Sequence, residues 1–148
     1  MKIGIFDSGI GGLTVFRQLM KKLPNNDYVY LGDTARLPYG IKSRKTVIEY
    51  SIKNTQFLIN KGCDLIVIAC NTASAFADDT LRKKFNVPIF NVIDSGVSAV
   101  KDSGIRNIGI IATPSTIDSK TYSNRLKKLK NIKKIIRRDL EHFYNIYV

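Results

Sequence analysis

The chain has few of the features that mark membrane, secreted and metal-dependent proteins. Its 148 residues contain no apolar run near the roughly 18 residues of a membrane-spanning helix, so we expect no membrane segment. Two cysteines are too few for a disulfide scaffold, and the first residues have a carboxylate at Asp7 and no small-residue cleavage site of a signal peptide. No spaced cluster of metal ligands and no pyridoxal-phosphate signature is present. We therefore expect a cytoplasmic, reduced protein without metal or cofactor.

The charge is strongly basic but unevenly spread. The chain has 24 Lys and Arg against 12 Asp and Glu, a net charge of +12. Residues 115–148 have nine Lys or Arg and three Asp or Glu, which is half of that net charge. A nucleic-acid-binding protein is the alternative that such a charge suggests. Because no aromatic side chains alternate with these lysines as stacking platforms, we expect a solvated basic tail and no nucleic-acid partner.

Short apolar runs alternate with helical stretches, which predicts an α/β fold with an open, mostly parallel sheet flanked by helices. Strands are expected at residues 3–6, 28–31, 65–69, 87–92 and 108–112. Helices are expected at residues 12–23, 44–60 and 73–84, then one ending near residue 101 and one starting at Thr113. Ser43 suits the N-cap of the second helix, and Gly62 suits its end. After about residue 131 the periodicity stops, so no regular element is predicted there.

Polar side chains follow each predicted strand at its carboxyl end, where parallel sheets bind their ligands. Asp7 and Ser8 follow the first strand, and residues 32–40 and 70–74 follow the second and third. Residues 94–96 and 113–116 follow the last two. Hydroxyl, amide, carboxylate and thiol groups are therefore expected on one rim.

Cys70 is the strongest candidate for a catalytic residue because it lies between an apolar strand and a helix start. A helix N-terminus favours the thiolate, which is the reactive form of cysteine. The competing interpretation is a small buried residue at a strand end, although the polar Asn71 and Thr72 that follow favour a site. Cys63 lies on the order of 20 Å away, across an extended strand, so we expect it to be structural.

The glycine-rich turn at residues 9–12 lacks both the GxGxxG spacing and the Lys-Ser/Thr pair of a P-loop. Its strand-to-helix position still suits an anion held by backbone N–H groups, such as a substrate carboxylate. A tight turn would also explain the glycines, but not Asp7 and Ser8 beside them.

Three motifs resemble the amino-terminal motifs of bacterial glutamate racemases, within the aspartate/glutamate racemase superfamily. They are residues 7–15 (Asp-Ser-Gly-Ile-Gly-Gly-Leu-Thr-Val), 32–40 (Gly-Asp-Thr-Ala-Arg-Leu-Pro-Tyr-Gly) and 70–75 (Cys-Asn-Thr-Ala-Ser-Ala). The resemblance covers roughly residues 1–126. It implies a flavodoxin-like, racemase-type fold and a cofactor-independent interconversion of L- and D-glutamate that supplies peptidoglycan synthesis. It also implies that Cys70 is one of two catalytic cysteines on opposite faces of the substrate α-carbon, and that Asp7 assists it. The substrate-binding positions that it implies are Asp7, Ser8, Pro38, Tyr39, Gly40, Asn71, Thr72, Thr113 and Thr116.

The chain also departs from the pattern that it resembles. The second cysteine of these racemases lies in a downstream Gly-Cys-Thr-His motif, which these 148 residues do not contain. If the chain racemises glutamate by itself, the single histidine, His142, is the first candidate for the second acid. We therefore expect an amino-terminal portion of the enzyme. Residues 1–95 would form a first α/β domain without its returning carboxyl-terminal segment, and residues 96–148 the start of an incomplete second one, with a divergent basic tail from about residue 131. Uncovered sheet edges favour self-association, as a homodimer. The alternative is a non-catalytic fragment or binding module that retains one half of the site.

Overall fold

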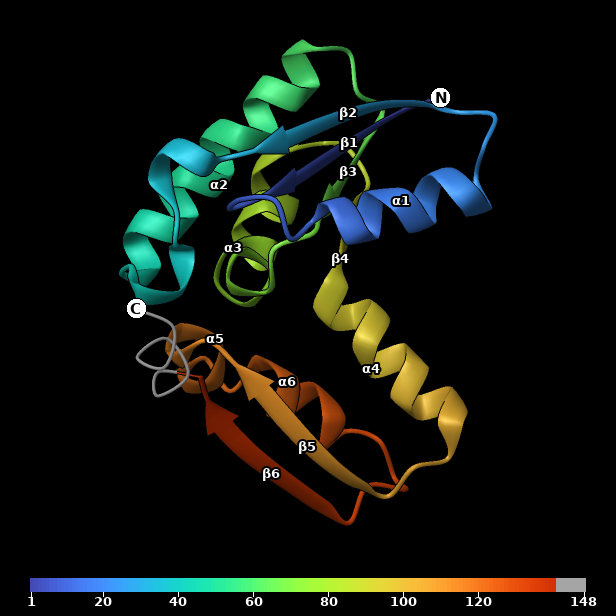
Figure 1. Cartoon of the computed structure of the whole chain (residues 1–148), viewed down its shortest axis with the longest axis vertical. Coiled ribbons are helices and arrows are strands. Elements are labelled where there is room, and N and C mark those ends of the chain that lie inside the picture. Colours follow the sequence, from blue (N-terminus) through green and yellow to red (C-terminus); the bar gives the residue numbers. More distant parts are fainter. Residues whose placement is uncertain (141–148) are drawn as a thin grey trace.

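The computed structural model describes residues 1–140, which form two parts, each with a parallel sheet (Figure 1). The first sheet has the strand order β2-β1-β3-β4. Its strands are β1 (Lys2–Asp7), β2 (Asp27–Gly32), β3 (Leu65–Ile68) and β4 (Ile89–Asn91). All three pairings are parallel, so the carboxyl ends of the four strands lie at one edge of the sheet. The predicted class, an α/β fold with parallel strands and flanking helices, is confirmed.

Helices cover both faces of this sheet. Residues Ile3 and Ile5 of β1 pack with α1 (Leu13–Lys22), whereas Phe6 packs on the opposite face with α2 (Arg44–Asn60) and α3 (Asn71–Lys84). Figure 1 shows α1 on one side of the sheet and α2 and α3 on the other. This division follows from the strand itself, because successive side chains point to opposite faces. The predicted cap of α2 is confirmed, since Ser43 Oγ accepts the Thr46 N–H at 3.1 Å.

The second part follows α4 (Val92–Ser103), which ends at Gly104 in the left-handed conformation with φ +69°. It contains β5 (Asn107–Ala112), α5 (Pro114–Asp118), α6 (Thr121–Leu126) and β6 (Lys134–Asp139). Two short 3-10 helices, Thr34–Arg36 and Tyr39–Ile41, follow β2 in the first part. The expected domain boundary between residues 95 and 96 falls inside α4, and the division into domains stays a prediction.

The expectation that no regular element follows residue 131 is wrong for β6. This strand pairs in parallel with β5, with Ile108 opposite Ile135 and Ile110 opposite Arg137. Its three basic residues obscure the strand pattern in the sequence, since most of its side chains are exposed. Backbone pairing with β5 forms the strand, and Lys and Arg are common on exposed edge strands.

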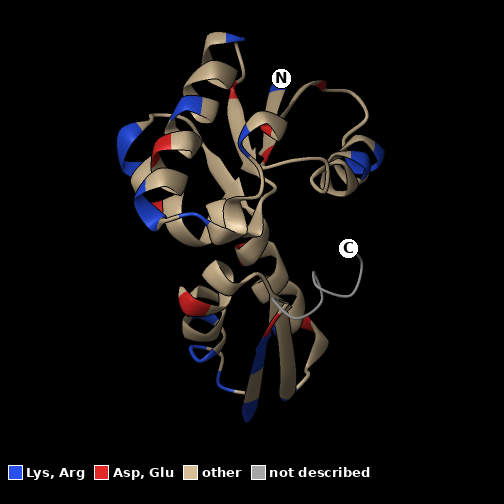
Figure 2. Ribbon diagram, turned by 60° about the vertical axis from the view of Figure 1, so that its left-hand side comes forward, with Lys and Arg blue, Asp and Glu red and all other residues tan. Residues whose placement is uncertain are grey.

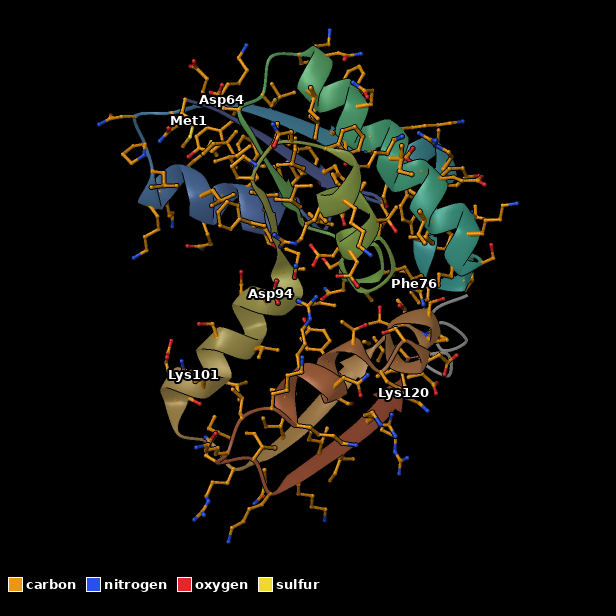
Figure 3. All side chains as sticks on the ribbon, turned by 180° about the vertical axis from the view of Figure 1, so that it is seen from behind. Met1, Asp64, Phe76, Asp94, Lys101 and Lys120 are labelled. Carbon is orange, nitrogen blue, oxygen red and sulfur yellow. The ribbon has the colours of Figure 1, made fainter. Side chains whose placement is uncertain are left out.

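A charged cluster joins the two parts. Asp78 of α3 accepts hydrogen bonds from Arg82 Nε at 2.9 Å and from Arg125 Nη2 of α6 at 3.2 Å. Arg125 also pairs with Asp94 near the start of α4, and Figure 3 shows Asp94 where the two parts meet. These ion pairs connect three helices and hold α6 against the first part.

Lys and Arg residues are distributed along several helices and on β6 (Figure 2). Within residues 1–140, no helix combines the length and the apolar character that crossing a membrane requires.

Candidate active site

A cavity of about 430 Å³ lies at the carboxyl ends of β1 and β3 and is closed on one side by the second part. Of the predicted site residues, those that line it are Asp7, Ser8, Pro38, Tyr39, Gly40, Cys70, Asn71, Thr72 and Thr113. Thr116 does not line this cavity. The fold therefore brings together groups from three separate motifs, because the parallel strands all end at the same edge.

Cys70 is the N-cap of α3, and only 5% of its surface is exposed. Its Sγ accepts the Ala73 N–H at 3.4 Å, and its thiol donates to Ser8 Oγ at 3.5 Å. Burial is the largest influence and raises the pKa of the Cys70 thiol; the hydrogen bonds from Ala73 and Ser8 lower it, and the charge of Asp7 raises it further. The sequence predicted a favoured thiolate at this helix start. That expectation is not met, because desolvation of the thiolate outweighs the donors of the helix.

The Asp7 carboxylate accepts hydrogen bonds from N–H groups of the glycine-rich turn. Its Oδ2 accepts hydrogen bonds from the Gly9 N–H at 3.1 Å and the Gly12 N–H at 3.0 Å. The anion that this turn binds is thus a carboxylate of the chain itself, whereas the sequence suggested a substrate carboxylate. Glycine is required at position 12 because a Cβ there would lie 2.6 Å from Asp7 Cβ and 2.9 Å from Ala69 Cβ.

The loop that contains Pro38 and Gly40 is anchored by the buried side chain of Tyr39. The Tyr39 hydroxyl donates to Asp33 and accepts a hydrogen bond from Asn54 Nδ2 of α2 at 3.0 Å. Burial and the hydrogen bond to Asp33 raise the pKa of Tyr39, so the hydroxyl stays protonated. The Tyr39 hydroxyl is therefore engaged by Asp33 and Asn54, and this anchor holds Pro38 and Gly40 at the cavity wall.

The second part contacts this loop closely. A Cβ at Gly40 would lie 2.6 Å from Thr113 Cβ, and the Ser115 hydroxyl donates to the Gly40 carbonyl at 2.6 Å. Three hydroxyls meet behind this contact: Thr72 Oγ1 lies 3.1 Å from that of Thr113 and 3.2 Å from that of Thr116. Thr116 is 2% exposed and lies outside the cavity, where its hydroxyl contacts the hydroxyls of the two cavity-lining threonines.

Cys63, the other cysteine, does not line the cavity. Cys63 is buried in the core beneath Gly4, where a Cβ would meet its Sγ at 3.0 Å, which agrees with a structural role. His142 lies outside the described residues. Among residues 1–140, no three His, Cys, Asp or Glu side chains are grouped to hold a metal ion.

Sequence reasoning missed Tyr122, which lines the cavity from α6. Its hydroxyl donates to Asn71 Oδ1 at 2.8 Å. No motif surrounds Tyr122, and its position depends on how α6 packs against α3 and α4. Asp33 and Asn54, which anchor Tyr39, were missed as well, although Asp33 lies within the motif at residues 32–40.

A sequence model described as Asp/Glu/Hydantoin racemase matches residues 11–142, and the chain belongs to this family. A curated relative, the glutamate racemase of Aquifex pyrophilus, is 54% identical over 129 residues, which cover 86% of this chain and 51% of the relative. The crystal structure of glutamate racemase from Campylobacter jejuni has a TM-score of 0.91 and 40% identity, covering 99% of this chain and 59% of that one. The glutamate racemase of Francisella tularensis in complex with D-glutamate has a TM-score of 0.88 and 42% identity, covering 98% and 55%. The chain thus spans about half the length of the curated relatives it matches.

Proposed function

We propose that this chain provides one half of the active site of a glutamate racemase, in which Cys70 moves the α-proton of glutamate on one face. Family membership and the relatives' names support this substrate, as does the D-glutamate complex of the Francisella tularensis protein. The observation on which the proposal depends is the position of Cys70. A buried thiol with two hydrogen-bond partners lines a cavity whose wall also contains hydroxyl, amide and carboxylate groups.

The chemistry at Cys70 is a proton transfer. The thiolate removes the α-proton, so that the C–H bond breaks, an S–H bond forms and the electron pair is left on the substrate. Ala73 N–H and the Ser8 hydroxyl stabilise the thiolate by hydrogen bonds. Burial and the negative charge of Asp7 make that thiolate a stronger base, which suits a weakly acidic C–H bond.

Inversion requires a second acid on the opposite face of the α-carbon. The Gly-Cys-Thr-His motif is absent from the 148 residues. We propose that the second thiol belongs to the half of the relatives' length that this chain does not span. On this proposal the complete reaction needs no cofactor, and its D-glutamate supplies peptidoglycan synthesis in the cytoplasm.

Hydrogen–deuterium exchange tests Cys70 without requiring inversion. The purified chain is incubated in D₂O with D-glutamate and, separately, with L-glutamate, and deuterium at the α-carbon is measured by NMR. We expect slow exchange of one enantiomer with little racemisation, because one acid–base group serves one face.

Cys70→Ala should abolish this exchange, and Cys63→Ala, which removes the other buried thiol, should keep it. Exchange that persists in Cys70→Ala would refute the assignment. Binding of glutamate without any exchange in the unmodified chain would instead support the alternative of a binding module with one half-site.

A further inference from the structure

Tyr122 lies at the meeting point of three helices, beside the candidate active site. It comes from α6, and its ring lies against Gly96 of α4, where an added Cβ would be 3.5 Å from a ring carbon. Its hydroxyl reaches α3 and donates to Asn71 Oδ1 at 2.8 Å. Tyr122 also lines a second cavity of about 470 Å³ along β5, so its side chain forms part of the wall between the two cavities.

The hydrogen bond from Tyr122 determines which end of the Asn71 amide is available. An asparagine amide has one carbonyl oxygen that accepts and one NH₂ group that donates. The oxygen is occupied by Tyr122, and among residues 1–140 no group accepts a hydrogen bond from Asn71 Nδ2. The Asn71 side chain is exposed and lines the cavity, so its free group there is a donor.

Tyr122 can act in this way only as a protonated donor held in place. Burial raises the pKa of Tyr122 more than the charge of Arg125 lowers it, which keeps the hydroxyl proton at neutral pH. Arg125 lies one turn further along α6 and pairs with Asp78 and Asp94 of the neighbouring helices. The same ion pairs that join the two parts therefore hold α6, which contains Tyr122, beside α3, which contains Asn71.

We propose that Tyr122 is a positioning residue that orients the Asn71 amide so that its NH₂ group donates to a carboxylate of the substrate. The inference rests on the proposed function, because it takes glutamate as the ligand. A carboxylate only accepts hydrogen bonds. Without the Tyr122 hydroxyl, the exposed amide is free to rotate and to present its oxygen to the substrate, which repels a carboxylate.

Tyr122→Phe tests this because it removes a single oxygen atom and keeps the ring against Gly96. Tyr28→Phe is the matched control, since within residues 1–140 the Tyr28 hydroxyl donates only to the Leu19 and Leu23 carbonyls at the carboxyl end of α1. The dissociation constant for D-glutamate is measured for each variant. We expect Tyr122→Phe to weaken binding about three- to tenfold, the effect of losing one neutral hydrogen bond, and Tyr28→Phe to leave it unchanged.

A double-mutant cycle shows whether Tyr122 acts through Asn71. In an Asn71→Ala background, Tyr122→Phe should have little further effect on glutamate binding, because the group that it orients is gone. A full additive loss, or an unchanged dissociation constant in Tyr122→Phe alone, would overturn the inference.

The Asn71 side-chain amide signals in the NMR spectrum of the ligand-free chain give an independent readout. They should move in Tyr122→Phe and not in Tyr28→Phe, and an unchanged Asn71 signal in Tyr122→Phe overturns the inference. If the signals move as expected but the unmodified chain binds no glutamate, the proposed function is refuted while the contact between Tyr122 and Asn71 is supported.

Discussion

Replacing Asp78 by Asn tests whether the charged cluster holds the two parts of the molecule together. The Asp78 side chain is 6% exposed and accepts from Arg82 at 2.9 Å and Arg125 at 3.2 Å, whose side chains are 42% and 24% exposed. A hydrogen bond to a charged group contributes roughly 1.5–3 kcal/mol when it is sheltered. Because Arg82 is exposed, solvent screening reduces the contribution of its bond to the free energy of unfolding. Asn at position 78 also keeps one acceptor oxygen. We therefore expect Asp78→Asn to lower the free energy of unfolding by about 2–3 kcal/mol.

Asp79→Asn is the matched control, because it makes the same change at the next, exposed position of α3. It should alter the free energy of unfolding by less than about 0.5 kcal/mol. Urea denaturation followed by circular dichroism gives both values by linear extrapolation. Equal midpoints and equal slopes for Asp78→Asn and the unmodified chain would refute the reasoning. A loss of stability for Asp79→Asn as large as that for Asp78→Asn would also refute it.

Three further outcomes are expected. Iodoacetamide should alkylate Cys70 faster than Cys63 under native conditions, because Cys70 lines the cavity whereas Cys63 is buried in the core. The Cys70 rate should keep rising past the ordinary thiol pKa, because burial raises the pKa of Cys70. Peptide mass spectrometry measures both rates, and faster alkylation of Cys63 or a plateau of the Cys70 rate at neutral pH would contradict this. Gly12→Ala, which places a Cβ 2.6 Å from the nearest carbon, should lower thermal stability by about 1–3 kcal/mol. Gly109→Ala, with nothing within 4 Å, should not show that steric loss, and equal melting temperatures would contradict the packing argument. Stability should fall as the pH rises above the ordinary tyrosine pKa, because the raised pKa of Tyr39 makes the unfolded chain lose that proton first; Tyr39→Phe should flatten the alkaline limb of the denaturation profile, and an equally steep limb would count against it.

Local sequence signals predicted the regular elements of the first part closely. The apolar run at residues 65–69 contains β3, and Ser43 caps α2 as its side-chain oxygen suggested. These features are predictable because a strand or helix cap depends on neighbouring residues and on the period of the apolar positions. By contrast, β6 forms through pairing with β5, and nothing within residues 134–139 shows that partner.

The candidate site also combines features that the sequence predicts with features that it does not predict. The motif at residues 70–75 and the strand order place Cys70 at the rim, and Asp7 and Ser8 lie beside it, as the parallel arrangement predicts. The ionisation of Cys70 was not predictable from the helix start alone. Its pKa depends on how completely the surrounding chain excludes water, and burial outweighs the nearby donors.

The sequence by itself determined which residue types stand at the carboxyl ends of the strands, because strand and turn signals are local. Only the tertiary structure decided how those groups are used. It turned the N–H groups of the glycine-rich turn toward Asp7, anchored Tyr39 to Asp33 and brought Tyr122 from a distant helix to Asn71. Tyr122 and Asn71 lie far apart in the sequence and meet only because α6 packs beside α3, whereas the contacts of Asp7 and Tyr39 form within their own turns. In each case a hydrogen bond forms only where the fold brings donor and acceptor to about 3 Å.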